Sequence, residues 1–408
     1  MNTTVNVTAL LEAELDAVKA QGRYRDYLHL ERRTDLAPRA LVHRPDGDTE
    51  EITIWCSNDY LGISHHPRVA EAVAEAVRTV GLGTGGARSI SGTSTYHQEL
   101  ETELAAWYRK EKALLFTTGF GANDAALGVL GRKIPGLVVF SDELNHASMI
   151  QGIRGGGAAK RIFRHNDTAH LRELIAEVGP DVPKLIVFES LYSMEGDFAP
   201  IEEIVEIAEE AGALTYLDEI HSVGIYGATG AGYAEEKGLL DRITLIQGGF
   251  GKGLGGAGGY LTGPRVIVDL VRSFAVPFVF STSGPAPVIA GALAAVRQVR
   301  EDSAERDLLA ARSAEVKAGL RDRGIPALSY DSHIVPVLVG DPHKNKELSA
   351  LLVREHGIYV QPVNAPTVPA GTERLRVTPT TRHTAEDVQT FIRALDKSWS
   401  ALGLPRTV

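Results

Sequence analysis

The sequence predicts an α/β protein built on a largely parallel sheet with helices on both faces. Short apolar runs alternate with helical patterns such as Thr168–Val178 and Ile201–Glu210, which is typical of strand–helix–strand units. Ligands of such sheets bind at the carboxyl ends of the strands, and polar residues follow several of these runs. The strand candidates are Leu137–Ser141, Arg161–Arg164, Leu185–Ser190, Leu214–Asp218 and Ile243–Ile246.

Composition places the chain among ordinary globular proteins. Its 408 residues are enough for one or two domains with a large core. The formal net charge of −10 argues against a nucleic-acid or acidic-membrane partner. A single cysteine, Cys56, excludes an internal disulfide framework and fits a reducing cytosol. No stretch resembles a signal peptide or approaches the ~20 apolar residues of a membrane span, so we expect a cytoplasmic protein.

The first 60 residues are expected to form an N-terminal helix and arm. Thr8 can cap a helix that ends at Gly22 and carries apolar residues on one face. Gly22–Arg25 contains two arginines, for which surface solvation is the default interpretation. Glu51–Trp55 alternates as a strand, and Pro67 begins the next helix.

Two segments offer backbone groups to a ligand. Gly81–Thr93 is unusually rich in glycine for a connector that precedes the helix Tyr96–Lys110, which favours ligand contact over a plain loop. Thr117–Phe120 precedes the helical stretch Ala122–Leu130, and amide groups at a helix N-terminus suit a phosphate. An ordinary helix cap explains this second segment nearly as well.

The last part of the chain is expected to form a smaller α/β domain. A long helical stretch, Ala286–Arg323, crosses into it. Its expected strands and helices are His333–Val339, Ile358–Val363, Arg374–Thr378, Lys346–Glu355 and Ala385–Leu402.

The stretch Ile243–Tyr260 carries the strongest chemical signal, because glycines surround a single lysine, Lys252. The phosphate-binding pattern G-x-x-x-x-G-K-[ST] fails, since Gly253 follows the lysine. The pattern G-x-G-x-x-G begins at Gly251 but is not followed by a helical signal. For a single lysine in a glycine-rich stretch, the default interpretation is a solvated residue of a surface loop. The other alternative is a lysine that forms a Schiff base with pyridoxal phosphate.

A pyridoxal phosphate site also requires a carboxylate for the pyridine nitrogen, and Asp218 ends a neighbouring apolar strand. His221 could bond the phenolic oxygen of the cofactor, and His146 could lie flat over its ring. Alone, each histidine is more often an ordinary polar residue, and Asp218 could simply cap a helix. Together with Lys252 they favour the cofactor site.

Several motifs resemble those of the pyridoxal-phosphate-dependent α-oxoamine synthases, namely Cys56–Gly62, Asn145–Ser148, Phe188–Met194, Asp218–Gly224 and Phe280–Ser283. Within that family the chain looks most like the 5-aminolevulinate synthases, through Gly22–Arg25, Tyr359–Asn364, Pro366–Pro369 and Gly371–Arg376. The order and spacing of these motifs match over nearly the whole chain.

The resemblance implies a fold-type I transferase, with a mostly parallel seven-stranded sheet in a large domain and a smaller C-terminal α/β domain. The expected parts are an N-terminal helix and arm, a large cofactor-binding domain and a small domain, at residues 1–60, 61–290 and 291–408. The family also implies a homodimer with the active site at the subunit interface. No metal is expected.

The resemblance assigns the chemistry to four residues. Lys252 holds the cofactor and then removes a proton from the α-carbon of glycine. Asp218 keeps the pyridine nitrogen protonated, His221 contacts the ring oxygen, and His146 stacks on the ring. The other implied cofactor contacts are Ser193, the backbone of Gly119 and Phe120 at the phosphate, and Thr282 at the phosphate of the opposite subunit's cofactor.

Substrate contacts follow from the same resemblance. Arg376 pairs with the glycine carboxylate, because a planar guanidinium suits two oxygens, and Asn58 lies beside it. Arg25 is implied to bind the free carboxylate of succinyl-CoA. The implied reaction condenses glycine with an acyl-CoA, with succinyl-CoA as first choice. It releases coenzyme A and carbon dioxide and yields 5-aminolevulinate for tetrapyrrole and haem biosynthesis.

Departures from the family pattern leave the acyl donor open. Ala87 and Ser89 replace a threonine and an asparagine that help define the succinyl pocket. Gly249 replaces a threonine that binds the phosphate, Gly253 replaces the usual alanine, and Ala365 replaces an aromatic residue. The alternatives are a related synthase that uses another acyl-CoA or small amino acid in specialised metabolism, an inactive cofactor-binding paralogue, and a simple aminotransferase.

Overall fold

The computed structural model describes residues 6–20, 24, 27–44, 47–329 and 331–407. The chain forms two compact units, a large one of residues 58–310 and a small one of residues 1–57 and 311–408.

This division corrects the expected domain boundaries at residues 60/61 and 290/291. The N-terminal arm belongs to the C-terminal unit, because β3 (Thr49–Ile54) pairs in parallel with β12 (Ile358–Tyr359). Residues 291–310 belong to the large unit, because α11 (Ala286–Glu301) packs against α2 (Pro67–Val80) and α3 (Thr95–Trp107).

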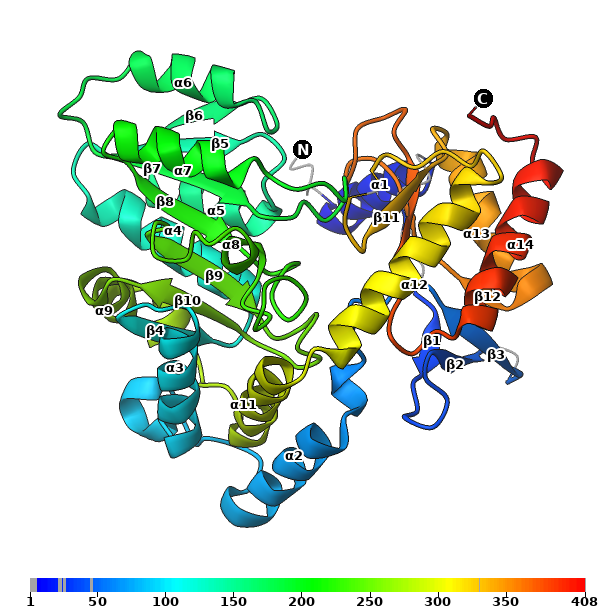
Figure 1. Ribbon diagram of the computed structural model, residues 1–408, viewed down its shortest axis with the longest axis horizontal. Coiled ribbons are helices and arrows are strands. Elements are labelled where there is room, and N and C mark those ends of the chain that lie inside the picture. The colour runs from blue at the N-terminus through cyan, green and yellow to red at the C-terminus, as the bar shows by residue number, and fades with distance from the viewer. Residues whose placement is uncertain (1–5, 21–23, 25–26, 45–46, 330, 408) are drawn as a thin grey trace, which may run out of the picture. The chain divides into compact units, whose positions relative to one another are not determined.

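The large unit is built around a seven-stranded sheet in which β10 alone runs antiparallel to its neighbours, which confirms the predicted sheet (Figure 1). The spatial order is β4 (Lys112–Phe116), β10 (Gly259–Gly263), β9 (Leu245–Gly249), β8 (Leu214–Asp218), β7 (Lys184–Glu189), β5 (Val138–Asp142) and β6 (Ala159–Phe163).

Both faces of this sheet are buried, which explains why its strands have continuous apolar sequences. Successive residues of a strand point to opposite faces. Ile186 and Phe188 of β7 therefore pack into the core beneath α7 (Ile201–Glu210), whereas Leu185 and Val187 pack against α4 (Gly119–Lys133) and α5 (Ala147–Gly156). Figure 1 shows α7 on one side of the sheet and α4 and α5 on the other.

The glycine-rich stretch forms two strands, whereas the sequence predicts one. The expected strand Ile243–Ile246 is observed as β9 over Leu245–Gly249, and the unexpected β10 begins at Gly259. These glycines pair with each other across the two strands, Gly259 opposite Gly249. A Cβ atom at Gly259 would lie 2.5 Å from Gly119 Cα, so the close approach requires glycine.

The expected continuous helix Ala286–Arg323 is two helices, α11 and α12 (Ala304–Arg321). Asp302 adopts an extended conformation between them, and its Oδ1 accepts a hydrogen bond from the Ala304 amide at 2.9 Å. Aspartate favours such helix ends over helix interiors, which explains the break. The other helices of the large unit are α6 (Thr168–Ala176), α8 (Tyr233–Glu236), α9 (Arg265–Phe274), α10 (Val276–Val279) and the short turns Ile63–His65 and Arg88–Gly92.

The small unit contains two sheets. The expected strand Ile358–Val363 is divided, because β12 joins β3 whereas β13 (Pro362–Val363) joins β14 (Arg374–Val377). The first sheet is completed by β1 (His29–Glu31) and β2 (Arg39–His43), and the second by β11 (Val335–Leu338). The helices are α1 (Val7–Ala20), the C-terminal part of α12, α13 (Pro342–His356) and α14 (Ala385–Ala401).

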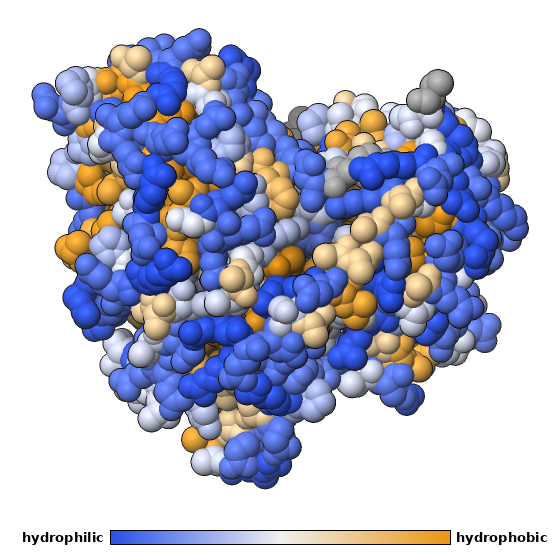
Figure 2. Space-filling view, viewed as in Figure 1, coloured by the Kyte–Doolittle hydropathy of each residue, from blue (hydrophilic) through white to orange (hydrophobic). Residues whose placement is uncertain are grey.

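The surface of each unit is mostly hydrophilic on the face seen in Figure 2. Among the residues that the structure describes, no helix has both the length and the apolar character needed to cross a membrane.

Candidate active site

A buried carboxylate, Asp218, lies at the carboxyl end of β8. Its Oδ2 accepts a hydrogen bond from Asn123 Nδ2 at 2.8 Å, and its Oδ1 accepts one from the Ile220 amide at 2.9 Å. Tyr216 donates its hydroxyl to Asn123 Oδ1 at 2.7 Å. The Asp218 carboxylate is therefore held in one orientation by donors from two elements.

Asn123 is a site residue that the sequence analysis missed. It is buried in α4, and its amide nitrogen also donates to Ser148 Oγ at 2.9 Å. The sequence signal for Asn123 was its position as an uncharged polar residue within the otherwise apolar face of a helix. An amide at such a position indicates buried hydrogen-bond partners, because an unpaired buried amide would be costly.

Glu189 is a second missed carboxylate, and strand pairing places it next to Asp218. Its Oε1 accepts a hydrogen bond from the His146 amide at 2.6 Å. Burial raises the pKa of Glu189 well above its ordinary value, and the charge of Asp218 adds to the shift. A like charge close by disfavours ionisation, so burial beside Asp218 favours the protonated form of Glu189.

His146 begins α5 and connects to the same hydrogen-bond network. Its Nδ1 lies 2.7 Å from Ser148 Oγ, the oxygen that also accepts from Asn123. His146 is exposed as a residue, and its ring lies edge-on to the exposed ring of Phe120, with centroids 6.4 Å apart. Partial desolvation lowers the pKa of His146, the charge of Asp218 opposes this shift and the charge of Lys252 reinforces it.

Lys252 lies in the turn that follows β9, where the glycine-rich backbone is closely packed. The Gly255 amide donates to the Lys252 carbonyl at 2.8 Å. Gly255 has φ +61°, and a Cβ atom there would lie 2.2 Å from the Ser64 amide nitrogen. The charge of Lys252 acts on the pKa values of both His146 and Glu189, so the predicted lysine belongs to the same electrostatic cluster as Asp218.

His221 follows Asp218 by three residues and is buried. Its Nδ1 lies 2.9 Å from the hydroxyl oxygen of Tyr60. Tyr60 also donates to Asn58 Oδ1 at 3.1 Å. The structure thus brings together the two predicted residues His221 and Asn58 through a tyrosine that the sequence analysis did not select.

A candidate anion-binding site lies at the N-terminus of α4. Thr118 Oγ1 accepts from the Gly121 amide at 2.9 Å, which leaves the amides of the first two helical residues, Gly119 and Phe120, without intrahelical partners. A Cβ atom at Gly119 would lie 2.7 Å from Ile220 Cδ1. Exposed amides at the positive end of a helix suit a phosphate group.

The site therefore fits pyridoxal phosphate by the chemistry of its donors. A buried anion for the ring nitrogen, a lysine and a helix N-terminus for the phosphate all lie at the carboxyl edge of one sheet. Gly249 is explained by the same packing, because a Cβ atom there would lie 2.8 Å from Ile220 Cδ1. Ile220 occupies the space that a threonine side chain would need. Gly253 is also confined, because a Cβ atom there would lie 2.5 Å from the Val223 carbonyl oxygen.

The remaining predicted residues of the large unit lie on other segments of the chain. Ser193 is partly buried in the turn after β7. Thr282 is exposed and forms an isolated bridge with Ala87. Ser89 is exposed, and the neighbouring Arg88 forms a two-pronged ion pair with Glu101 at 2.9 and 3.0 Å.

One predicted substrate residue, Arg376, belongs to the small unit. Arg376 is buried in β14, where its charge and that of Lys317 add to burial in lowering the pKa of His333. Arg25 lies outside the described residues.

Comparison with known proteins identifies the family. Residues 50–395 match the aminotransferase class I and II family. The 5-aminolevulinate synthase of Rhodobacter capsulatus is 48% identical over 398 residues, which cover 97% of each protein. The 5-aminolevulinate synthase of Rhizobium meliloti is 49% identical over 395 residues, covering 97% of this chain and 98% of that protein.

Solved structures agree with this assignment. The serine palmitoyltransferase of Sphingomonas wittichii superposes with a TM-score of 0.89 at 30% identity, covering 97% of this chain and 98% of that one. A serine palmitoyltransferase from S. paucimobilis, solved with a bound PLP–myriocin aldimine, also has a TM-score of 0.89, at 29% identity and 98% and 100% coverage. The predicted fold and family are confirmed: the chain belongs to the aminotransferase class I and II family and, within it, to the α-oxoamine synthases related to 5-aminolevulinate synthase.

Proposed function

We propose that the protein is a pyridoxal-phosphate-dependent 5-aminolevulinate synthase that condenses glycine with succinyl-CoA and releases coenzyme A and carbon dioxide. The observation that carries this proposal is the buried Asp218 carboxylate, oriented by Asn123 and lying in one electrostatic cluster with Lys252. Near-full-length identity of 48–49% to 5-aminolevulinate synthases supports the same reaction.

The cofactor is proposed to be held by this chain's own donors. Asp218 pairs with the protonated ring nitrogen, and the amides of Gly119 and Phe120 bind the phosphate. His146 covers the ring, while His221 binds the ring oxygen and Ser193 lies beside it. When bound, pyridoxal phosphate supplies an electron sink that stabilises negative charge at the α-carbon of glycine.

Lys252 is the proposed base. Its amine must be uncharged to accept the proton from the α-carbon, and it later returns a proton to the product. Glu189 contributes by accepting a hydrogen bond from the His146 amide, and burial raises its pKa.

Substrate binding is assigned to the residues that the family resemblance implies. Arg376 and Asn58 bind the glycine carboxylate, and Arg25 binds the free carboxylate of succinyl-CoA. Thr282 is proposed to contact the phosphate of the cofactor that the opposite subunit of a homodimer binds. A cytoplasmic location for this enzyme is supported by its single cysteine, Cys56.

A second candidate function has specific support from Ala87 and Ser89. A threonine and an asparagine at these positions would offer hydrogen bonds to an acyl chain, and the smaller residues leave more room. A related α-oxoamine synthase with a different acyl-CoA, or a small amino acid other than glycine, would use the same cofactor site.

The deciding experiment incubates the holoenzyme with glycine and a panel of acyl-CoAs that includes succinyl-, acetyl- and octanoyl-CoA. We expect thiol release with succinyl-CoA and a product with the mass of 5-aminolevulinate. The Lys252→Ala variant should remain folded and release no thiol. Product from acetyl- or octanoyl-CoA alone would favour the second candidate, and full activity of Lys252→Ala would refute both.

A further inference from the structure

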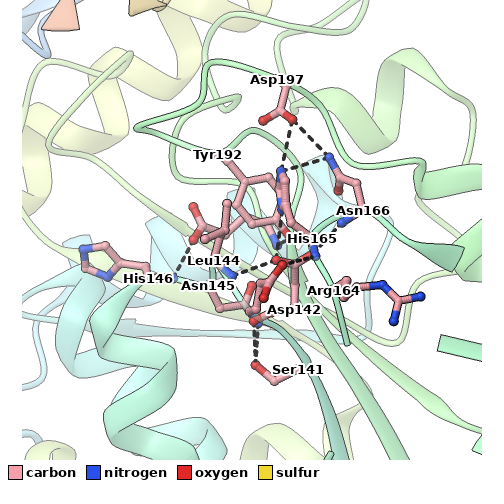
Figure 3. A network of polar contacts seen from close by, with 12 residues as sticks. Ser141, Asp142, Leu144, Asn145, His146, Arg164, His165, Asn166, Tyr192 and Asp197 are labelled. Carbon is pink, nitrogen blue, oxygen red and sulfur yellow. Dashed lines mark hydrogen bonds and ion pairs between the residues drawn. The ribbon is translucent and has the colours of Figure 1, made fainter. Parts of the chain in front are cut away.

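His165 has no role in the site described so far, yet it lies between two carboxylates (Figure 3). It follows β6, and its Nδ1 and Nε2 are each 3.0 Å from a carboxylate oxygen, of Asp142 and Asp197 respectively. A neutral imidazole has one N–H and could donate to one of them, whereas an imidazolium donates to both. Burial opposes the charge, but the hydrogen bonds and charges of the two aspartates outweigh it and raise the pKa of His165 to about 10.

The Asp142 carboxylate anchors the loop that leads to His146. Asp142 is buried at the end of β5, and its Oδ1 accepts from the Leu144 amide at 2.8 Å. Its Oδ2 accepts from the Asn166 amide at 2.9 Å, which ties this loop to the residue after His165. His146 follows only four residues after Asp142, and Figure 3 shows its ring turned away from His165.

The Asp197 carboxylate anchors the turn that carries Ser193. The Asp197 carbonyl accepts from the Tyr192 amide at 3.1 Å and so closes the turn. Asn166 Nδ2 donates to Asp197 Oδ2 at 3.2 Å. The Tyr192 ring lies edge-on to the His165 ring, with centroids 4.4 Å apart and planes at 85°. The imidazolium is thus confined between the loop and the turn.

We propose that His165 is a positioning residue that fixes the loop carrying His146 relative to the turn carrying Ser193. The inference rests on the proposed function, in which both of those residues contact the cofactor. Exposed ion pairs contribute little to holding two segments together. The pair of His165 with Asp142 is different, because the side chain of Asp142 is only 1% exposed. Loss of the imidazolium would leave that buried carboxylate without its counter-charge, and the loop would have to rearrange.

The test uses three variants of the full chain. His165→Gln removes the cation, Asp197→Ala removes one acceptor, and Asp197→Asn keeps an acceptor oxygen of the same shape. His43→Gln is the matched control, because His43 forms a 2.9 Å pair with Glu31 on the surface of the small unit.

The first measurement is amide hydrogen exchange of the cofactor-free protein. In His165→Gln and Asp197→Ala we expect exchange to quicken about tenfold or more over both 143–146 and 191–198, as the loss of a charged hydrogen bond predicts. Asp197→Asn should stay near wild type, and His43→Gln should match wild type in both segments.

The second measurement follows pyridoxal phosphate in the reconstituted protein. We expect about tenfold faster cofactor dissociation in His165→Gln and Asp197→Ala. The induced circular dichroism of the bound cofactor, which reports its orientation against neighbouring rings, should weaken in the same variants and recover in Asp197→Asn.

Two results would overturn the inference: wild-type exchange over 143–146 and 191–198 in both disruptive variants, or faster exchange confined to residues 164–167. These outcomes are separate from the proposed function. A wild-type protein that makes no product from glycine and acyl-CoAs would refute the function, while the exchange data would still decide whether His165 couples the two segments.

Discussion

At the scale of single residues, the buried amide of Asn123 connects the acid and one of the histidines of the proposed site. It donates to both Asp218 Oδ2 and Ser148 Oγ, and Ser148 lies against His146. A buried carboxylate that loses a donor carries an uncompensated desolvation cost. Asn123 is therefore expected to determine both the orientation of Asp218 and the affinity for the cofactor.

Replacing Asn123 by leucine of similar size tests this role. We expect the Asn123→Leu variant to lose about 1–3 kcal/mol of unfolding free energy and to bind pyridoxal phosphate more weakly. Urea unfolding and cofactor titration measure the two effects. Asn345→Leu is the control, because Asn345 is a buried amide of the small unit that donates to the Val363 carbonyl at 3.1 Å. It should lose stability without losing cofactor affinity, and equal affinities in the two variants would contradict the role of Asn123.

Gly249 and Ile220 form a coupled pair. A Cβ atom at Gly249 would meet Ile220 Cδ1 at 2.8 Å, so Gly249→Ala should destabilise the protein by about 1–3 kcal/mol through overpacking. Ile220→Val removes Cδ1, and the double variant should be more stable than the sum of the two single effects predicts. A double-mutant cycle of unfolding free energies measures the coupling. Strict additivity would show that the two positions do not compete for space.

At the scale of elements, the sheet brings the chemistry together because parallel strands end at the same edge. Glu189 and Asp218 are directly paired at the ends of β7 and β8, and β9 leads into Lys252. Helix N-termini meet this edge too, through His146 at α5 and Thr118 at α4. Alternating strands and helices thus explain why residues distant in sequence form one site.

The start of α14 offers a stability test within the small unit. Thr384 Oγ1 accepts from the Asp387 amide at 3.1 Å, and Asp387 Oδ2 accepts in return from the Thr384 amide at 2.8 Å. Thr384→Ala should therefore cost about 1 kcal/mol, measured by urea unfolding or by exchange of the first turn of α14. Thr390→Ala on the exposed face of the same helix is the control and should be nearly neutral. Equal losses in both variants would rule out a capping effect.

At the scale of the whole molecule, the charge of His165 should appear in the pH dependence of stability. Its pKa is raised from 6.5 to about 10 in the folded state, where Asp142 and Asp197 face the ring. The folded state thus binds the proton more tightly than the unfolded state. The resulting stabilisation is fully present below the unfolded pKa of 6.5 and is lost as the pH rises through about 10.

The measurement compares wild type with His165→Gln, because the other titrating groups are common to both proteins. The difference in unfolding free energy should be largest near about pH 6 and should shrink by about pH 10. Urea unfolding at several pH values gives this difference. A constant difference across that range would mean that His165 is not a cation in the folded state.

Much of this architecture could be read from the sequence because its signals are local. The strand Leu214–Asp218 and the helix Ile201–Glu210 have the predicted bounds, since apolar runs and helical periodicity depend on neighbouring residues. Predictions were wrong where distant backbone decided the outcome. β10 forms because Gly259 pairs with Gly249, and the segment Ile358–Val363 divides between two sheets.

In the candidate active site, too, some residues could be predicted from local sequence signals and others depended on distant contacts. Asp218, Lys252 and the two histidines could be selected because their residue types and positions after strands suit one cofactor chemistry. Asn123 had only a weak signal, as a polar residue among apolar ones in a helix. Glu189 and Tyr60 had none, because the role of a carboxylate or a hydroxyl depends on partners that folding brings close. Their roles depend on contacts across 95, 43 and 161 positions of the chain.

The sequence by itself determined the fold class, the family and the identity of the reactive groups, because periodicity and motif spacing are properties of the chain. Only the tertiary structure decided that burial raises the pKa of Glu189, that a Cβ atom at Gly249 would crowd Ile220, and that His165 lies between two aspartates. Desolvation, close packing and charge pairing act between groups that folding brings together, so their strength depends on distances that no linear pattern contains.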